Sequence, residues 1–441
     1  MASQSPVYNL NAVLKATGMK ADVLRAWERR YDLPKPQRTP GGHRLYSEWD
    51  IETLKWLRSR QAEGLSISRA ADLWKEIVES GHDPLTKYLP ADTPHRSAQA
   101  LPEEARIELL RREWRSACLG FDGSLADEIL SQAFAIYPLE TVVTELLQRA
   151  ISDIGHLWYV GQVTEQQEHF ATGMASRRLE AQIAAAAHPT RPQIVCVGCP
   201  PGEWHTLPIE ILGLLLQRRG LSVLYLGADI PVERLGETAQ AARPDLIILA
   251  AQQLATAATL QSAALALQTG GVPLAYGGLV FTRIPGLRER IPAYYLGDSL
   301  GGSVGAVEQL LAAPAPYPTP AVMDRAHRAL ARQYREKRAP IEMAVNKKLQ
   351  RADLKIGPIR AANAFFGHGL SAALDLGDPA FLEPDLEWVK GLLTGRRIQA
   401  GELEAYLAAY GRTAHKELGE ASRPVTEWID SYLTRSQASL R

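Results

Sequence analysis

The sequence predicts a multidomain protein of mixed α and α/β class, and three observations support that prediction. Its 441 residues suffice for two to four domains. Apolar residues recur at helical spacing up to about residue 188 and again after Met323. Between these regions, short β-branched runs alternate with helical stretches, a pattern typical of a parallel sheet with crossover helices. All-helical parts are therefore expected on both sides of an α/β domain.

Residues 1–78 form a basic head. Residues 8–17 and 19–31 predict two short helices around a turn at Gly18, which is the spacing of a helix-turn-helix motif. Residues 1–65 hold eleven Lys and Arg against seven Asp and Glu, although the whole chain carries 49 of each sign. The positive charge that attracts nucleic acid is therefore concentrated in the head.

The second predicted helix and the segment after it carry candidate DNA contacts. Arg25, Arg29 and Arg30 fall at positions i, i+4 and i+5, so some of them can enter the major groove while others address phosphates. A solvated charged face is the plain alternative. Gly41 and Gly42 then permit a tight hairpin, which predicts a basic wing.

The run VLRAWERRYDLPKPQRTPGGHRLYSEWDIETLKWL resembles the winged helix-turn-helix of the MerR family. The resemblance implies that the three arginines serve the recognition helix. It also implies wing contacts to the DNA backbone from His43, Arg44 and Tyr46, and binding as a dimer to a pseudo-palindrome.

A predicted linker and a predicted helical bundle follow the head. Residues 79–102 contain prolines that interrupt any helix, so they predict a linker. Residues 103–188 show apolar residues at helical spacing, with a helix opening at Pro138, and predict a bundle of about four helices.

Residues 189–315 predict a doubly wound, Rossmann-like parallel sheet. Its first strand, residues 193–199, runs into a loop with Glu203 and His205 before a helix near Leu207. Open α/β sheets bind ligands at this end of their strands. Imidazole is a good axial ligand for a transition metal, and a nearby carboxylate can fix its tautomer. Such a pair in isolation is more often an ordinary surface feature.

The phrase CPPGEWHTLPIEILGLLLQRRGLSVLYLGADIP resembles the cobalamin-binding domain of methionine synthase, corrinoid proteins and the CarH/LitR light-dependent repressors. The resemblance implies that His205 is the lower axial ligand of cobalt and that Glu203 is its carboxylate partner. Gly277 and Gly278 fit the glycine pair that lets the backbone approach the nucleotide tail, with a plain turn as the alternative.

The predicted bundle adds a second motif: Trp158 is followed, after nine residues, by Glu168 and His169. This resembles the Trp-x9-Glu-His motif of CarH-type sensors, and the resemblance implies that these residues cover the upper face of the corrin ring, where Trp packs against an adenosyl group. Ordinary helix packing is the alternative, because a Trp at the end of an apolar stripe is usually core.

Three departures from these families bear on mechanism. Pro208 stands where the family has Gly, and residues 250–254 replace the usual Ser-x-Leu motif, so the tail is expected to sit differently. Tyr159 stands where many of these sensors have a His that captures cobalt after illumination. Either His156 or His169 substitutes for it, or no new bond forms.

Residues 316–441 predict a fourth, all-helical domain with breaks near residues 367–369 and 377–379 and at Pro384. Its aromatic residues suit either an ordinary core, an oligomerisation surface or a pocket for a planar acidic tetrapyrrole. The arrangement resembles the photocobilins, which join a cobalamin domain to a helical biliverdin domain. Non-sulfur attachment is implied, because no Cys follows Cys199. The candidate residues for this second chromophore are His368, His415, Arg396 and Arg397.

Other features exclude whole classes of protein. No apolar run approaches the ~20 residues that span a bilayer, and no signal pattern opens the chain, so a cytoplasmic location without membrane contact is expected. Cys118, Cys196 and Cys199 are too few for a disulfide framework. The last two form a CxxC inside a predicted strand, so we expect buried strand residues rather than a redox or metal site.

The resemblances together imply a light-responsive transcription regulator rather than an enzyme. Cobalamin, expected as adenosylcobalamin, is the chromophore, with biliverdin as the candidate second one. Photolysis is expected to change self-association, as dimer or tetramer, and binding to promoter DNA. The alternatives are a light-independent sensor of cobalamin level and a corrinoid methyltransferase or mutase subunit. The latter is disfavoured, because the chain has no room for a substrate barrel.

Overall fold

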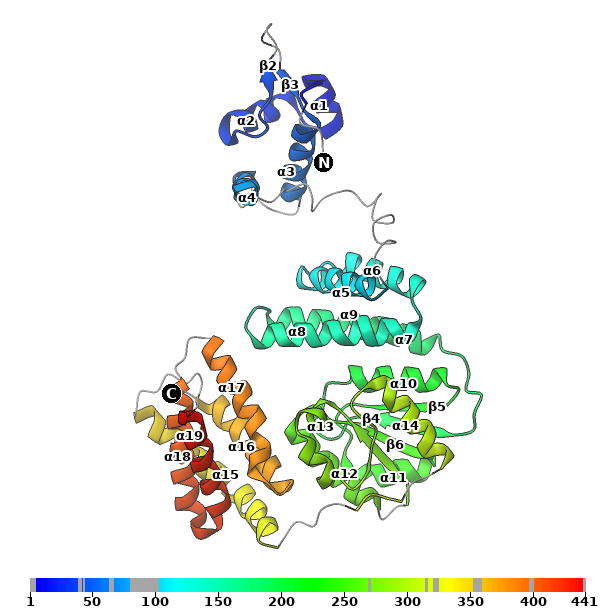
Figure 1. Ribbon diagram of the computed structural model, residues 1–441, viewed down its shortest axis with the longest axis vertical. Helices are drawn as coiled ribbons and strands as arrows, with labels where there is room; N and C mark the ends of the chain where they lie inside the picture. Colours follow the sequence, from blue (N-terminus) through cyan, green and yellow to red (C-terminus); the bar gives the residue numbers. More distant parts are fainter. Residues whose placement is uncertain are drawn as a thin grey trace. The chain divides into compact units, whose positions relative to one another are not determined.

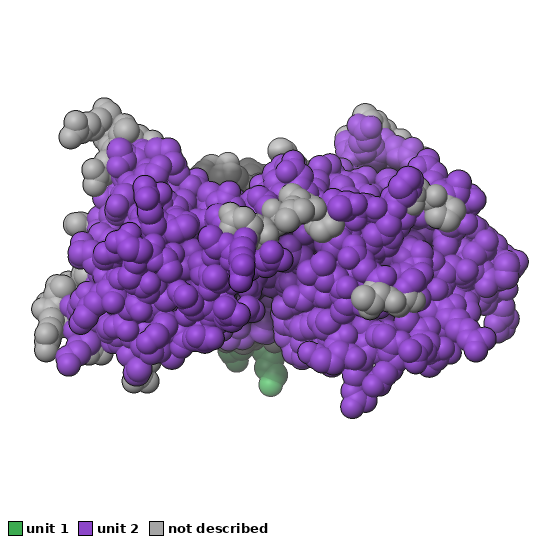
Figure 2. All heavy atoms as spheres, turned by 90° about the horizontal axis from the view of Figure 1, so that it is seen from below, with its two compact units in different colours: residues 1–102 green, residues 103–441 purple. Residues whose placement is uncertain are grey.

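The computed structural model divides the chain into two compact units, residues 1–102 and 103–441, which are coloured separately in Figure 2. Four expected site residues, or turn residues supporting them, lie outside the described part: Gly41, His43, Arg396 and Arg397. The structure describes residues 5–38, 42, 44–62, 67–79, 103–268, 271–313, 316–319, 325–351, 359–395 and 400–438.

The described part of the head confirms the predicted helix-turn-helix and its wing. Helix α1 ends at Gly18, which adopts a φ of 65°, and α2 follows as the second helix. Strands β2 and β3 pair antiparallel with Arg38 opposite Arg44, which makes the expected hairpin. The elements are β1 (Tyr8–Asn9), α1 (Leu10–Thr17), α2 (Ala21–Tyr31), β2 (Gln37–Arg38), β3 (Arg44–Tyr46), α3 (Glu48–Ala62) and α4 (Ile67–Glu79).

The second unit begins with the predicted helical bundle, in which Pro138 caps the helical stretch that follows it. Segments α7, η2 and α8 follow one another without a gap, so they form one continuous helical segment of the bundle. Thr164 and Gln167 form a capping box that fixes the start of α9. The elements are α5 (Glu103–Leu119), α6 (Gly123–Ile136), α7 (Leu139–Thr141), η2 (Val142–Gln148), α8 (Arg149–Tyr159) and α9 (Glu165–Ala184).

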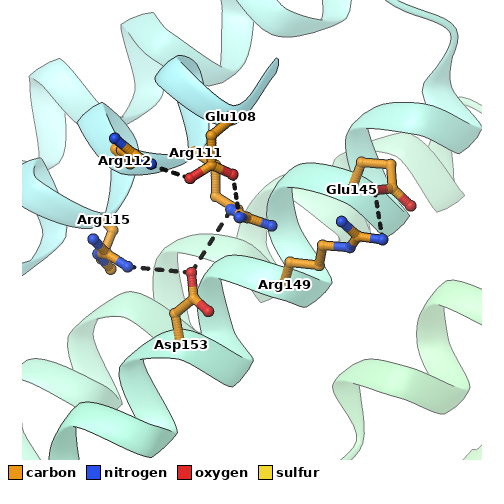
Figure 3. A network of polar contacts seen from close by, with 7 residues as sticks. All are labelled: Glu108, Arg111, Arg112, Arg115, Glu145, Arg149 and Asp153. Atoms are coloured by element: carbon orange, nitrogen blue, oxygen red, sulfur yellow. Dashed lines mark hydrogen bonds and ion pairs between the residues drawn. The ribbon is translucent and has the colours of Figure 1, made fainter. Parts of the chain in front are cut away.

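A network of charged side chains ties α5 to α8 (Figure 3). Asp153 of α8 points toward two arginines of α5, with Oδ2 at 3.2 Å from Arg115 Nη1 and 3.7 Å from Arg111 Nε. Glu108 accepts from Arg111 and Arg112 on the same helix. The network therefore fixes the position of α8 along α5.

The centre of the second unit is a five-stranded parallel sheet of order β5-β4-β6-β7-β8, which confirms the predicted doubly wound fold (Figure 1). The chain passes from β4 outward to β5 and then returns to the other side of β4, so the carboxyl ends of β4 and β6 flank the switch point. The elements are β4 (Ile194–Gly198), α10 (Leu207–Arg218), β5 (Ser222–Gly227), α11 (Val232–Ala242), β6 (Leu246–Ala250), α12 (Leu254–Gln268), β7 (Leu274–Gly277), α13 (Leu279–Arg283), η3 (Pro285–Arg290), β8 (Tyr294–Tyr295) and α14 (Leu300–Ala312).

Two hydrophobic cores of this unit meet at the sheet. One joins the bundle to α10, α14 and residues of the strands, including Trp114 and Leu216. The other joins α11, α12 and alternate strand residues to the C-terminal helices, including Leu260 and Leu370. Alternation along buried strands sends successive side chains to opposite faces, so the two faces carry different domains.

The C-terminal region is all-helical, as predicted, but the expected break at residues 367–369 is wrong, because α16 runs through it. A Cβ on Gly367 would lie 2.2 Å from Glu342 Oε1, and one on Gly369 would lie 2.5 Å from Leu382 Cδ1. These glycines allow close packing rather than a turn. The elements are α15 (Arg325–Arg351), α16 (Ile359–Asp375), η4 (Pro379–Leu382), α17 (Glu383–Gly395), α18 (Ala400–Leu418), η5 (Gly419–Ser422) and α19 (Arg423–Ala438).

Candidate functional site

The loop after β4 holds a fully buried carboxylate, Glu203, whose relative exposure is 0%. Its Oε1 accepts from the backbone N–H of His205 at 3.0 Å and from the imidazole Nδ1 at 2.6 Å. Its Oε2 accepts from the backbone N–H of Gln252 and the hydroxyl of Thr256, both at 2.7 Å. All four acceptor positions of the carboxylate are therefore used, two of them for His205.

These bonds fix the position of the hydrogen between Glu203 and His205. Burial would raise the pKa of Glu203, but the hydrogen bonds that it accepts outweigh burial and hold the pKa below its usual value. The ionised carboxylate cannot donate, so the hydrogen between the two side chains lies on Nδ1 of His205. Nε2 of the neutral ring then carries the lone pair, and the side chain is 59% exposed. The ring is thus oriented as a metal ligand from its outer nitrogen.

The same loop is fixed to its neighbours at its base. Gly202 adopts a φ of 81°, and its N–H donates to Oδ1 of Asp229 at 2.8 Å. The hydroxyl of Thr259 donates to the carbonyl of Pro201 at 2.8 Å. His205 consequently projects from a rigid loop at the switch point of the sheet, where α/β folds bind their ligands.

The carboxyl ends of β6 and β7 complete this edge. Gly278 has a φ of 125°, and a Cβ there would lie 1.8 Å from the carbonyl oxygen of Ala251, so only glycine fits. The side-chain oxygen of Gln252 accepts from the N–H of Leu279 at 2.9 Å, whereas its Nε2 is buried without a partner among the described residues. Gly277 has open space around its Cβ position.

These observations test whether a corrinoid would fit. A buried amide donor without an acceptor is the kind of group that a bound ligand satisfies. Gln252 stands within the segment that replaces the Ser-x-Leu motif, and it is a candidate site residue that the sequence alone did not single out. Among the described residues there is no cluster of three or more His, Cys, Asp or Glu that could hold a metal ion by itself. A single oriented imidazole suits a metal that arrives with its own macrocycle.

The second motif lies on the bundle, at the end of α8 and near the start of α9. Trp158 is 40% exposed, so it is not an ordinary core residue. The hydrogen bond with Glu203 raises the pKa of His205 against the opposing effect of burial, and the negative charges of Glu203 and Glu168 add to the rise.

His169 lies on the exposed side of α9. Its side chain is 69% exposed, and its Nε2 lies 3.6 Å from Glu168 and 3.9 Å from Glu165. His156 contacts the ring of Tyr159, with centroids 6.1 Å apart.

An aromatic contact that sequence reasoning missed joins the bundle to the C-terminal region. The hydroxyl of Tyr159 donates to the carbonyl of Trp388 at 2.9 Å, and their rings stack with centroids 5.3 Å apart. No sequence signal links positions so far apart in the chain. Only the fold brings α8 and α17 together.

In the head, Arg25, Arg29 and Arg30 are exposed on α2. Arg44 Nε donates to Glu28 at 3.0 Å, and the Tyr46 hydroxyl donates to the same carboxylate at 2.6 Å. Tyr46 is fully buried, so its hydroxyl is engaged by Glu28 rather than open to a phosphate.

In the C-terminal region the two candidate histidines lie on different helices. His368 on α16 donates from Nδ1 to the carbonyl of Ala364 at 2.6 Å, and His415 on α18 contacts the hydroxyl of Ser422 at 3.1 Å. His368 and the neighbouring Phe365 are both exposed.

The three cysteines are free and buried. Burial raises the pKa of Cys118 and of Cys199 to about 12 and raises the pKa of Cys196. The prediction that both residues of the CxxC are buried is confirmed, and Cys196 lies in β4 as expected, whereas Cys199 directly follows the end of that strand. Raised pKa values disfavour a reactive thiol, which needs a lowered one. Among the described residues no helix is long and apolar enough to cross a bilayer.

Comparison with protein families matches three segments of the chain. The model of the MerR HTH family regulatory protein matches residues 8–77. Two models of B12 binding domains match residues 110–181 and 193–298, which are the bundle and the α/β domain. The motif loops described above lie inside these matches.

Curated relatives agree with this division. The HTH-type transcriptional repressor CarH of Myxococcus xanthus is 29% identical over 292 residues, which cover 65% of this chain and 94% of that protein. The repressor CarA of the same organism is 28% identical, over 54% of this chain and 75% of its own length. The HTH-type transcriptional regulator MlrA of Salmonella typhimurium is 38% identical, over 36% of this chain and 76% of its own length.

These relatives are transcription regulators rather than enzymes. The helix-turn-helix head implies that the chain binds DNA. The chain belongs to the MerR family of helix-turn-helix transcription regulators and carries B12-binding domains behind its DNA-binding head.

Proposed function

We propose that the chain is a light-responsive transcription regulator that holds adenosylcobalamin through His205. The observation that carries this proposal is the Glu203–His205 pair, in which a buried carboxylate directs the lone pair of Nε2 outward from the switch point. Cobalamin supplies a cobalt centre with a light-sensitive upper bond when it is bound. The protein supplies the lower ligand and, from the bundle, Trp158.

The residues have distinct roles in this proposal. Glu203 orients the imidazole, and Gly278 lets the loop after β7 pack against the carbonyl of Ala251 at the edge where the nucleotide tail would enter. Gln252 offers its unpartnered Nε2 to an acceptor on that tail. Trp158 is half-exposed, so an upper ligand could cover apolar surface that now faces solvent.

In the head, Arg25, Arg29 and Arg30 address promoter DNA from α2, and Arg44, held by Glu28, addresses the backbone from the wing together with His43. The chain acts in the cytoplasm as a dimer or tetramer. Loss of the upper ligand changes the population of these assemblies, because a ligand shifts an equilibrium only through its different affinity for the two states.

The test is reconstitution of the full chain with adenosylcobalamin in the dark, followed by green light. Absorption spectra, size-exclusion profiles and promoter binding are measured before and after illumination. The proposal expects spectral change together with a shift in assembly and in DNA affinity. A shift that follows cobalamin addition but not light identifies a sensor of cobalamin level instead. Unchanged retention in His205→Ala refutes the proposed ligand.

A second chromophore is supported by one observation. Phe365 and His368 are exposed on one face of α16, and Phe365 stacks on Trp388 with centroids 5.9 Å apart. This face suits a planar tetrapyrrole such as biliverdin, bound without sulfur, with Arg396, Arg397 and His415 as further candidates for its carboxylates. A red-absorbing band that persists through gel filtration after biliverdin addition, and that weakens in His368→Ala, is the expected result. Loss of the band in gel filtration contradicts it.

A further inference from the structure

The contact between Tyr159 and Trp388 is part of a longer row of rings. Trp388 stacks on Tyr159 at an interplanar angle of 23° and on Phe365 at 24°. Its ring also lies 6.3 Å from that of Trp158, measured between centroids. The bundle and the C-terminal helices are therefore in contact through aromatic rings, and on the bundle side these rings belong to Trp158 and Tyr159 at the end of α8.

The aromatic rings at both ends of this row are exposed to solvent. Trp158 is 40% exposed and Phe365 is 42% exposed, whereas Trp388 between them is partly covered. Large apolar side chains that remain exposed next to a binding edge indicate a surface that a ligand covers. Trp158 contacts Trp388 and, in the proposed function, lies at the upper face of the corrin, so this surface borders the proposed site.

Helix α17 packs so closely against Tyr159 that a residue with a side chain would clash at position 391. A Cβ on Gly391 of α17 would lie 1.9 Å from the Tyr159 hydroxyl. Gly391 has no left-handed backbone conformation, so a helix would favour alanine there. The absence of a side chain at Gly391 is explained by the tyrosine that packs against it.

The C-terminal helices are also anchored to the α/β domain. Helix α16 packs on α12, and Arg290 lies over the ring of Phe381 at 5.9 Å. Arg283 donates to the carbonyl of Pro384 at 3.4 Å. The C-terminal domain thus touches the α/β domain, which supplies His205, and the bundle helix α8, whose last two residues are Trp158 and Tyr159.

We propose that the C-terminal domain forms a third wall of the corrinoid site, in which Trp388, backed by Phe365, positions Trp158 over the side of the corrin opposite His205. This inference rests on the proposed binding of cobalamin. Trp388 is a positioning residue: it acts through Trp158 and Tyr159 on the ligand that occupies the upper face. The C-terminal domain is consequently coupled to that ligand through the two rings at the end of α8.

The test uses the full chain loaded with hydroxocobalamin and follows, by absorbance, the rate at which cyanide replaces the upper ligand. Gly391→Ala inserts a methyl group against the Tyr159 hydroxyl without removing any ring. Gly401→Ala is the matched control, because it makes the same change in a helix of the same domain, and none of the other described residues would come within 4 Å of the new Cβ apart from its chain neighbours and its own helix backbone. Trp388→Ala removes the ring, and Trp388→Phe restores an aromatic side chain.

We expect exchange to become roughly three- to tenfold faster in Gly391→Ala and Trp388→Ala, in line with the loss of aromatic contacts. The band position of bound hydroxocobalamin should shift in the same variants, since the environment of its upper face changes. Trp388→Phe and Gly401→Ala should stay close to the wild type. Retention of cobalamin should persist in all four, because His205 is untouched.

If both Gly391→Ala and Trp388→Ala keep the wild-type exchange rate and spectrum, the C-terminal domain does not form a wall of the corrinoid site. The proposed function is unaffected by that result. Failure of the wild-type chain to retain cobalamin at all refutes the proposed function itself. The Phe variant and urea denaturation of each apo-protein separate a lost contact from a lost fold.

Discussion

Replacement of Glu203 by glutamine tests the geometry of the site most directly. The substitution keeps the size of the side chain but exchanges one acceptor oxygen for an NH2 group. If the NH2 faces His205, its hydrogens oppose the Nδ1–H, and the imidazole must move its proton to Nε2, which removes the metal-binding lone pair. If it faces the other side, Thr256 can turn its hydroxyl, but the backbone N–H of Gln252 loses its partner.

The magnitude follows from these two orientations. An unsatisfied buried donor costs about 1–3 kcal/mol. The carboxylate partner of a metal-bound histidine contributes about 10- to 100-fold in metal affinity, equivalent to about 1.4–2.8 kcal/mol. We therefore expect Glu203→Gln to weaken cobalamin retention by about one to two orders of magnitude.

The assay is equilibrium dialysis of adenosylcobalamin in the dark, with the absorption spectrum of the retained cofactor. Thr256→Val serves as a control, because it removes one of the four hydrogen bonds and leaves the carboxylate on His205. Urea denaturation of the apo-protein reports any general loss of stability. Wild-type affinity and spectrum in Glu203→Gln would refute the argument that the buried carboxylate orients the ligand.

Four further predictions follow from other parts of the structure. Gly278→Ala should destabilise the α/β domain by about 1–3 kcal/mol in urea denaturation, because its Cβ would meet the Ala251 carbonyl, and an unchanged midpoint would contradict the close approach. Arg29→Ala should weaken DNA binding similarly on all sequences and lower the slope of log affinity against log salt by about 1, whereas a sequence-dependent loss would indicate base contact. Asp153→Asn should cost no more than about 1 kcal/mol, since the carboxylate is partly exposed, and a larger loss in thermal unfolding would show that the α5–α8 network is underestimated. In thiol titration with a disulfide reagent at pH 8, Cys199 should stay unreactive until the protein unfolds, and rapid native-state reaction would reopen the redox alternative.

The sequence by itself determined the domain order and the local motifs. Helical and strand periodicities are local properties, so the head, the bundle, the five strands and the C-terminal helices could be predicted from neighbouring residues. The Glu203–His205 pair could be found for the same reason, because both residues lie on one short loop. The exception is the region around Gly367 and Gly369, where glycine was expected to break a helix and instead admits the neighbouring side chains.

The tertiary structure alone decided how distant residues share one site. Gln252 and Thr256 complete the hydrogen bonds of Glu203 from the next strand connection, and no spacing rule links them to it. Tyr159 and Trp388 are separated by 229 positions, yet they stack. Periodicity determines which face of a helix or strand is apolar. Which elements pack against one another depends on the whole chain. The third wall that we propose for the site, formed by the C-terminal domain, could therefore be found only from the tertiary structure.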